Sequence, residues 1–262
     1  MKIIRRLFGN IDSVEKKILI EDALKIKLDS GYFNHDLDEK SEEYMRIKDL
    51  VYTLNLRDDV IGTAYDKNEI NSAKTLVFKG AWATGYPQPE DPIQILKNTY
   101  SKSCHECGVH GEQKMPFQIN EPKLSNHKII SLNWINDEIF AERNLYESFF
   151  KNLGIEMREA VLYKKNVNSK TIVQLIIPKA EFAIDLLGLD FTICPICKEK
   201  KYSPTVSGFF PALPNLNFSI LKTQEYFGSG HSAFNSIIVS NEIMNEMVKN
   251  KLAKQYNFIP TK

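Results

Sequence analysis

The residues best suited to chemistry are four cysteines in two pairs of identical spacing, with no cysteine left over. The pairs lie in the segments Cys104-His105-Glu106-Cys107 and Cys194-Pro195-Ile196-Cys197. A CxxC segment holds two sulfurs on one tight turn, a knuckle, and zinc prefers four tetrahedral ligands and favours thiolates. The two pairs therefore predict a closed, structural zinc (Zn²⁺) site, with ligands Cys104, Cys107, Cys194 and Cys197.

The two knuckles differ in the residues beside them. Gly108 follows the first pair and allows the left-handed backbone of the turn, whereas Lys198 follows the second pair, whose turn is stiffened by Pro195. The intervening segment 108–193 contains 86 residues. Closing such a loop costs about 4 kcal/mol, and structural zinc contributes about 10–16 kcal/mol of apparent binding free energy. The long separation is therefore compatible with one shared metal.

Three histidines, His105, His110 and His127, lie near the first pair in the sequence. One of them could replace a cysteine or bind a second metal, but exposed or hydrogen-bonded histidines are the simpler interpretation. A catalytic zinc keeps three protein ligands and an open position for water. Four available cysteines therefore favour a structural site.

A redox dithiol is the other possible use of Cys194 and Cys197. Such a thiol is stabilised as a thiolate where a helix begins after a strand. The short strand predicted at Phe191-Thr192-Ile193 supplies the strand, but Pro204 limits any following helix to about two turns. We therefore favour a metal site over a dithiol.

Catalytic motifs are absent from the sequence: it contains no Gly-rich phosphate loop, HExxH segment or nucleophile elbow. The segment Gly228-Ser229-Gly230-His231-Ser232 joins suitable residue types but lacks the strand-to-helix context of an elbow. We interpret it as a structured turn that enters a strand. The sequence predicts no catalytic residue and no enzymatic activity.

Composition and charge narrow the class of partner. The 262 residues include 43% hydrophobic and 11% aromatic residues, which predicts a globular chain. Lys and Arg total 34 against 33 Asp and Glu, and gripping nucleic acid through many phosphates requires a basic excess. We find no signal peptide and no run of about 18 apolar residues. We expect a cytoplasmic protein without a membrane partner, in a compartment where reduced CxxC pairs favour metal.

The first part of the chain, 1–74, is predicted to be a helical extension. Asp12 and Glu15 fit a capping box for a helix over 13–29, which Ser30-Gly31 would end. The charged stretch 36–43 is typical of a solvated helix face or a linker.

The remainder, 75–262, is predicted to form one zinc-binding α+β domain with a mixed sheet. Strands are expected at 75–78, 128–132, 158–164, 171–177, 236–239 and 256–259, and a loop at 80–87. Helices are expected after Asn136, ending at Gly154, and after Ser240, reaching Leu252. Each CxxC knuckle thus precedes a strand-helix-strand unit, which hints at a pseudo-repeat, and the two knuckles form a zinc-ribbon-like pair.

These residues together resemble the double-CxxCG-motif immunity proteins of bacterial toxin–immunity systems. The similarity covers 75–262. It rests on the two knuckles with Gly108, on the unit 129–162, and on an ending that runs Glu225-Tyr226-Phe227-Gly228-Ser229-Gly230, then Ile237-Ile238-Val239-Ser240, a helix and Phe258-Ile259-Pro260. Lys198 departs from the motif because a glycine is expected there, and the first sixty to seventy residues have no counterpart in the family.

The resemblance implies an immunity protein that binds a cognate protein toxin in the cytoplasm and neutralises it by non-catalytic occlusion. The four cysteines would then belong to the scaffold. The toxin-binding residues stay unknown, because such surfaces are tuned to one partner. The alternative is a zinc-ribbon nucleic-acid-binding or regulatory protein with a small basic patch, composed of Lys198, Lys200, Lys201 and Lys222.

Overall fold

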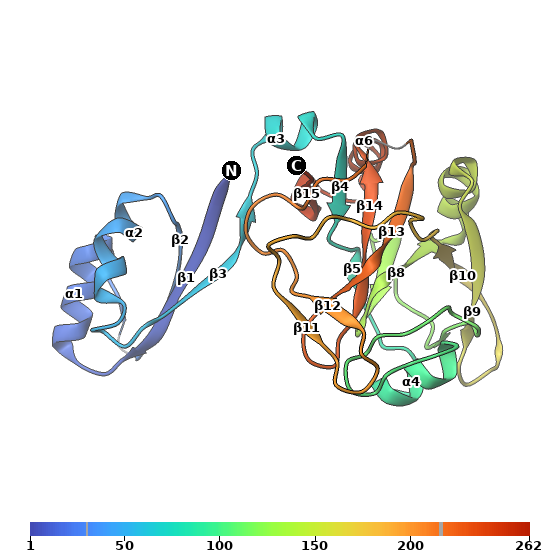
Figure 1. The fold of residues 1–262 in the computed structure, drawn as a ribbon, viewed down its shortest axis with the longest axis horizontal. Helices are drawn as coiled ribbons and strands as arrows, with labels where there is room; N and C mark the ends of the chain where they lie inside the picture. The colour runs from blue at the N-terminus through green and yellow to red at the C-terminus, as the bar shows by residue number, and fades with distance from the viewer. Residues whose placement is uncertain (30, 215–216) are drawn as a thin grey trace. The chain divides into compact units, whose positions relative to one another are not determined.

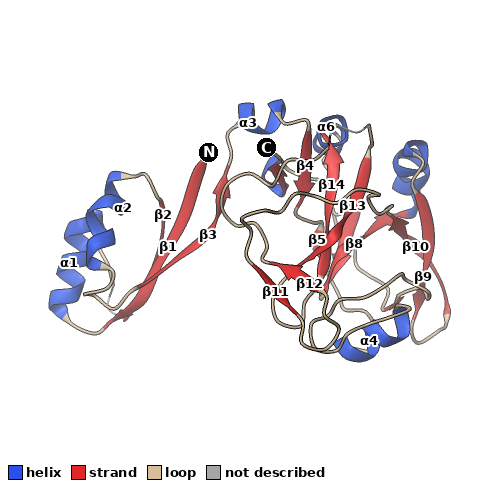
Figure 2. Ribbon diagram, viewed as in Figure 1, coloured by secondary structure: helices blue, strands red, loops and turns tan. Residues whose placement is uncertain are grey.

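The computed structural model describes residues 1–29, 31–214 and 217–262, and its chain divides into two compact units. The first unit comprises Met1–Glu69 with Thr205–Phe209, and the second comprises Ile70–Pro204 with Phe210–Lys262. The sequence predicts a division into 1–74 and 75–262, close to the observed boundary but without the Thr205–Phe209 segment in the first unit. Strands contain 37% of the residues and helices 22%, so the α+β class is confirmed, with strands predominating (Figure 2).

The first unit is built on a three-stranded antiparallel sheet, so the predicted helical extension is wrong. Its strands are β1 (Lys2–Ile11), β2 (Gly31–Asp38) and β3 (Arg57–Ala64), in the order β2-β1-β3. Two helices accompany them, α1 (Val14–Leu24) and α2 (Glu42–Ile47), the latter extended by a 3₁₀ turn at Lys48–Leu50. Leu7 of β1 and Ile20 of α1 belong to one fully buried core.

Strand β1 is not predicted from the sequence because it carries charged residues that form ion pairs with the neighbouring strands. Arg5 and Arg6 interrupt the apolar pattern of β1 in the sequence. In the structure, Arg5 Nε donates to Asp58 Oδ1 on β3 at 2.7 Å, and Arg6 Nε donates to Asp36 Oδ1 on β2 at 2.6 Å. The charged stretch 36–43 is therefore no linker, because it covers the end of β2 and the start of α2.

Helix α1 is shorter than the predicted helix over 13–29. Ser13, not Asp12, is the N-cap, and its hydroxyl accepts the Lys16 N–H at 3.1 Å. The helix ends at Leu24 because Lys25 adopts a left-handed conformation with φ 57°. Of the predicted stop, Ser30 lies outside the described residues, and Gly31 is the first residue of β2.

The second unit contains two six-stranded mixed sheets (Figure 1). The first sheet has the order β5 (Trp82–Ala83), β7 (Ile129–Leu132), β8 (Ile135–Glu142), β10 (Val167–Ile176), β9 (Glu156–Leu162) and β6 (Gln118–Ile119). The second has the order β11 (Phe191–Ile193), β12 (Lys200–Tyr202), β13 (Ile220–Phe227), β14 (Phe234–Ser240), β4 (Thr75–Phe78) and β15 (Phe258–Pro260). Strands β8 and β14 bring the two sheets side by side.

The helices of the second unit are short. They are α4 (Pro92–Thr99), a continuous helical segment at 143–153 that begins with α5 (Arg143–Leu145), α6 (Asn241–Lys249), and a 3₁₀ turn at Gln255–Asn257. Helix α3 (Lys67–Ser72) carries the chain across the division between the units. Among the described residues, no helix combines the length and the apolar composition needed to cross a membrane.

The predicted helix after Asn136 is partly wrong, because residues 135–142 form strand β8. Strands β7 and β8 are joined by a two-residue turn at Asn133 and Trp134, where Trp134 has φ 72°. Five consecutive residues of β8, from Asp137 to Ala141, are buried, so the strand shows no simple alternation. The helical segment begins only at Arg143, and it ends as predicted at Gly154, which has φ 73°.

The two predicted strand-helix-strand units share one spatial arrangement of strands. In the first sheet, β8 and β9 flank β10, both antiparallel to it, and the helical segment 143–153 connects them. In the second sheet, β14 and β15 flank β4 in the same way, and α6 connects them. The hairpins β7-β8 and β13-β14 also correspond, each with a parallel neighbour, β5 or β12.

The two units differ in where the middle strand comes from. Strand β10 follows β9 along the chain, whereas β4 precedes every other strand of its sheet. The shared spatial order of the strands, described above, supports the pseudo-repeat interpretation even though the middle strands come from different places in the chain.

Candidate metal centre

The four predicted cysteine ligands meet at one point. Their sulfur atoms all lie within 4.8 Å of one another, although 90 residues separate Cys104 from Cys194. The Sγ atoms of Cys104 and Cys194 are 3.8 Å apart, and those of Cys107 and Cys197 are 3.5 Å apart. A tetrahedron with metal–sulfur bonds of about 2.3 Å has edges of about 3.8 Å. These two separations therefore match the edges of a tetrahedral thiolate site.

Both knuckles form the same backbone hydrogen bonds. The Cys104 N–H donates to Val109 O at 2.9 Å, and the Gly108 N–H donates to Cys104 O at 2.9 Å. In the second knuckle, the Cys194 N–H donates to Glu199 O and the Lys198 N–H to Cys194 O, both at 3.0 Å. Lys198 thus occupies the position of Gly108, and it adopts the same left-handed backbone, with φ 64° against 77°.

The two knuckles differ in cover, because Gly108 of the first is buried whereas Lys198, at the matching position of the second, is exposed. A Cβ atom on Gly108 would collide with the backbone carbonyl oxygen of His231, in the turn that carries Gly228 and Gly230. Gly228 is restricted in the same way, because its Cβ would collide with the carbonyl oxygen of Ser232. The glycines of the first knuckle and of this turn therefore permit backbone contacts that no side chain would allow.

A buried lysine joins the first knuckle to the same turn. The Lys201 ammonium is almost fully buried and donates to three carbonyl oxygens, those of Cys107 at 2.9 Å, Gly230 at 2.6 Å and Ser232 at 3.0 Å. The hydrogen bond to the Cys107 carbonyl helps to fix the backbone that carries this cysteine. A positive charge here also offsets the negative charge that four thiolates would bring.

The cysteine thiols have unequal proton affinities in the metal-free cluster. Backbone N–H groups of Cys197 and Ile196 point at the Cys194 sulfur and lower its pKa to about 6. Burial, together with the neighbouring cysteine sulfurs, raises the pKa of the Cys107 thiol to about 12, against a smaller effect of the Val109 N–H. Burial also raises the pKa of Cys197. Binding of a divalent metal would displace the protons that these groups hold.

The three histidines near the first knuckle do not join the sulfur cluster, whose group of potential ligands in the described residues contains cysteines alone. The His105 carbonyl lies 3.2 Å from His231 Nδ1, and the His127 ring stacks on Trp82 with centroids 4.4 Å apart. His110 is buried and stacks on Tyr100 with centroids 3.8 Å apart.

The structure also disfavours a redox dithiol. The residues after Cys197 enter strand β12, so no helix N-terminus acts on the dithiol, and the lowered pKa of Cys194 comes instead from backbone N–H groups within the knuckle itself. All four cysteines are free, and the closest Sγ pair named above is well beyond the disulfide bond length of about 2.05 Å.

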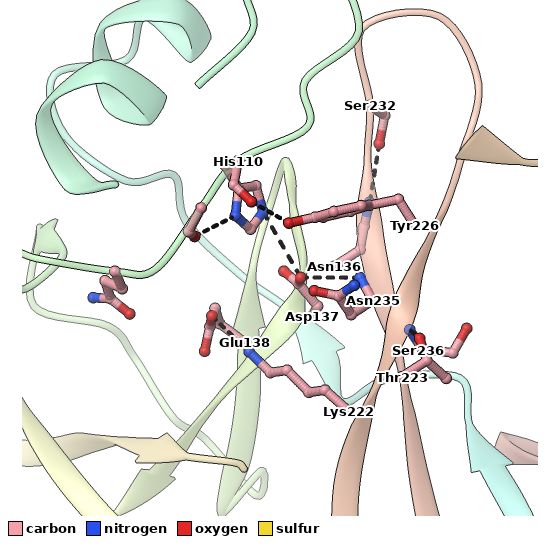
Figure 3. Close-up of polar contacts among 12 residues, drawn as sticks. His110, Asn136, Asp137, Glu138, Lys222, Thr223, Tyr226, Ser232, Asn235 and Ser236 are labelled. Atoms are coloured by element: carbon pink, nitrogen blue, oxygen red, sulfur yellow. Dashed lines mark hydrogen bonds and ion pairs between the residues drawn. The ribbon is translucent and has the colours of Figure 1, made fainter. Parts of the chain in front are cut away.

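A second cluster of functional groups, which the sequence did not reveal, lies in a cavity near the first knuckle (Figure 3). Lys222 Nζ donates to Glu138 Oε1 at 2.7 Å, and both side chains are buried. The Asn235 N–H donates to Asp137 Oδ2 at 3.1 Å, and His110 Nε2 lies 3.8 Å from the same oxygen. These residues come from separate segments with no shared spacing, so no local motif could have found them.

Comparisons with known proteins identify no family: no protein-family model, no curated protein and no solved structure matches this chain.

Proposed function

We propose that the chain is an immunity protein that binds a cognate protein toxin in the cytoplasm and neutralises it by occlusion, on a scaffold closed by one structural zinc ion. The supporting observation is that three of the segments that carry the resemblance to double-CxxCG immunity proteins, the two knuckles and the Gly-rich turn, meet in one place. Gly108 of the first knuckle contacts the Gly228–Ser232 turn, and both knuckles share one sulfur cluster.

Zinc is the metal that this donor set fits best. Four thiolates at tetrahedral spacing, three of them from buried cysteines, are typical of closed structural zinc sites. The metal would tie together two segments that the chain separates by 86 residues, counted from Gly108 to Ile193. In this proposal zinc holds the two knuckles, with their sheets, in a fixed arrangement and takes no part in a reaction. The zinc-ribbon-like description of the pair stays a prediction.

A protein partner is favoured over nucleic acid because two of the four lysines in the predicted basic patch are buried. Lys201 is buried against three carbonyl groups, and Lys222 is buried against Glu138. Lys198 and Lys200 are exposed, but Lys200 lies over the Phe191 ring, with Nζ 4.3 Å from its centroid. Half of the proposed patch is therefore unable to contact a phosphate backbone.

The decisive experiment pairs this chain with the product of the adjacent gene. Expression of that neighbour alone should arrest growth, and co-expression of this chain should restore it. A variant with Cys107→Ser and Cys197→Ser, which removes two ligands, should fail to rescue, whereas Ser103→Ala beside the first knuckle should rescue. A neighbour that is not toxic, or whose toxicity this chain leaves unchanged, would contradict the proposal.

The stoichiometry of inhibition separates occlusion from enzymatic inactivation. Titrating the purified toxin with this chain should abolish toxin activity at an equimolar ratio and yield a complex that survives size-exclusion chromatography. Inactivation of excess toxin by much less than one equivalent would instead show a catalytic activity and would contradict the non-catalytic mechanism. Binding to DNA or RNA at low salt, without a toxin complex, would favour the nucleic-acid alternative.

A further inference from the structure

The polar cavity of the second unit has the dimensions and the lining of a ligand site. Its volume is about 550 Å³, within the range of small-molecule sites. Seven polar residues that line it are almost fully buried: Tyr100, His110, Asp137, Glu138, Gln174, Lys222 and Asn235. Burying polar groups is costly unless each has a partner. The partners within the cavity therefore indicate which groups remain available to a ligand.

Both oxygens of Glu138 and one oxygen of Asp137 accept hydrogen bonds from the protein itself. Glu138 accepts from Lys222 at 2.7 Å and, through its other oxygen, from Gln174 Nε2 at 2.9 Å. Asp137 accepts the Asn235 N–H and faces His110 (Figure 3). Gln174 also exchanges two hydrogen bonds with Gln113, at 2.6 and 3.0 Å. The exposed Glu112 at the rim is the remaining carboxylate of the lining.

Several donors of the same cavity are not occupied. The Tyr100 hydroxyl is buried and has no hydrogen-bond partner in the part of the chain that the structure describes. Arg158 makes one long hydrogen bond, from Nη2 to Gln113 O at 3.5 Å, and forms no ion pair with a described residue. Lys179 at the rim lies over the Tyr226 ring, with Nζ 4.8 Å from its centroid. The cavity thus offers three donors without a short hydrogen bond to a described residue, two of them cationic.

The protonation states agree with this distribution. Burial, followed by the negative charges of Glu138 and Asp137, raises the pKa of Tyr100 well above its usual value, so the hydroxyl keeps its proton and can donate. Burial lowers the pKa of Lys222, but Glu138 and Asp137 outweigh it and the net shift is upward. Lys222 therefore stays charged and remains committed to Glu138.

We propose that this cavity binds a small molecule through a carboxylate group, which accepts hydrogen bonds from the Tyr100 hydroxyl and the Arg158 guanidinium. Arginine presents parallel N–H donors that match the two oxygens of a carboxylate. A phosphate group is disfavoured because its second negative charge would lie beside Asp137 and Glu138, and Lys222, which pairs with Glu138, is already used. Lys179 at the rim would favour entry of an anion.

Small carboxylates test the proposal on the zinc-loaded chain without a toxin, so the outcome does not depend on the proposed immunity function. Thermal unfolding and isothermal calorimetry would compare acetate, succinate, glutamate and citrate with inorganic phosphate and sodium chloride at matched ionic strength. At least one carboxylate should raise the melting temperature saturably and bind with a dissociation constant below about 10 mM. The two control salts should give no saturable shift.

Two variants assign the binding to the cavity. Tyr100→Phe removes only the unpaired hydroxyl, so the ligand-free melting temperature should stay unchanged or rise, while carboxylate affinity falls about tenfold. Arg158→Gln should weaken binding by at least about tenfold. The exposed residues Tyr256 and Lys249 supply matched controls, because Tyr256→Phe and Lys249→Gln should bind as the parent chain does.

Three results would overturn the proposal. The first is the absence of saturable binding for every carboxylate of the panel. The second is stronger binding of phosphate than of any carboxylate. The third is unchanged carboxylate affinity in both Tyr100→Phe and Arg158→Gln, when circular dichroism shows that the two variants are folded.

Discussion

The two knuckles have the same backbone hydrogen bonds and the same left-handed residue after the second cysteine, yet only one of them carries glycine there. Gly108 is required twice, once by its positive φ and once by the contact of its backbone with the His231 carbonyl. Lys198 faces only the first requirement and extends its ammonium 2.7 Å from the Pro195 carbonyl. A glycine after CxxC is therefore essential where another segment covers the knuckle and optional where none does.

Loss of a metal ligand should have the largest effect on the free energy of unfolding, and the loss should be equal for the two knuckles. Cys107→Ser and Cys197→Ser should each abolish stoichiometric zinc binding and lower the free energy of unfolding by at least about 5 kcal/mol, because a structural zinc site contributes directly to folding. Metal content and urea unfolding would measure both effects. The exposed Ser103 offers a control, since Ser103→Ala should leave both unchanged. A serine variant that keeps its zinc would contradict the shared site.

The glycine position should separate the two knuckles. Gly108→Ala should destabilise by about 3 kcal/mol, the sum of a left-handed alanine, about 1–2 kcal/mol, and a forced shift of the His231 backbone. Lys198→Ala changes a residue that is already not glycine, so its effect should stay within about 0.5 kcal/mol. Chemical denaturation of the zinc-loaded variants would compare them. Equal losses at the two positions would refute the distinction.

Acid should weaken metal binding, since zinc binds thiolates. The Cys107 thiol, with its pKa raised to about 12, and Cys197, with its pKa also raised, hold protons at neutral pH, whereas the pKa of Cys194 is lowered to about 6. At least two protons must therefore leave on binding. Apparent zinc affinity should fall by at least about 100-fold for each unit of pH decrease near pH 7. Competition with a chromogenic chelator would measure this slope, and a pH-independent affinity would contradict the thiolate ligand set.

Loss of the buried Lys201 should lower the free energy of unfolding more than loss of its exposed neighbour Lys200. Lys201→Met leaves three backbone carbonyls without their shared donor, and we expect a loss of about 2–3 kcal/mol. Lys200→Met alters an exposed residue of the same strand, and the loss should be about 0.5–1 kcal/mol at most. Thermal and urea unfolding of the two variants would provide the comparison. Equal effects would mean that Lys201 does not secure the first knuckle.

The smallest expected effect is a gain in stability, from the substitution Lys198→Gly. Lys198→Gly relieves a left-handed lysine, about 1–2 kcal/mol, but increases the entropy of the unfolded chain by about 0.5–1 kcal/mol. The net stabilisation should therefore be about 0.5 kcal/mol, detectable as a small rise in the denaturation midpoint. A clear loss of stability would show that the Lys198 side chain contributes more than its hydrogen bond to Pro195.

Local signals in the sequence predicted those parts of the structure that local interactions determine. The strand at 75–78 has the predicted bounds, and Ser240 caps α6 as expected, its hydroxyl accepting the Ile243 N–H at 3.3 Å. The cysteine cluster could also be predicted, because zinc chemistry constrains both ligand type and spacing. In contrast, β1 and β8 are stabilised by partners distant in the chain, which no window of neighbouring residues reveals.

The polar cavity could not be predicted from local sequence patterns for the same reason. Tyr100, Asp137 and Lys222 come together only because β8 of one sheet lies beside β14 of the other. Asp137 and Glu138 are ordinary helix formers or surface residues by type, and they were placed in a predicted helix. Strand β4 lies at the start of the unit but joins a sheet whose other strands come much later in the chain, and local patterns cannot predict this either.

The zinc content of the chain, purified from cells without chelators or added metal, tests the central claim most directly. Native mass spectrometry together with elemental analysis should find one zinc ion per chain, released when a thiol reagent modifies the four cysteines and accompanied by unfolding. A folded, monodisperse chain that carries no metal, or one that loses its zinc without loss of structure, would contradict the proposal that a four-thiolate zinc site closes the scaffold.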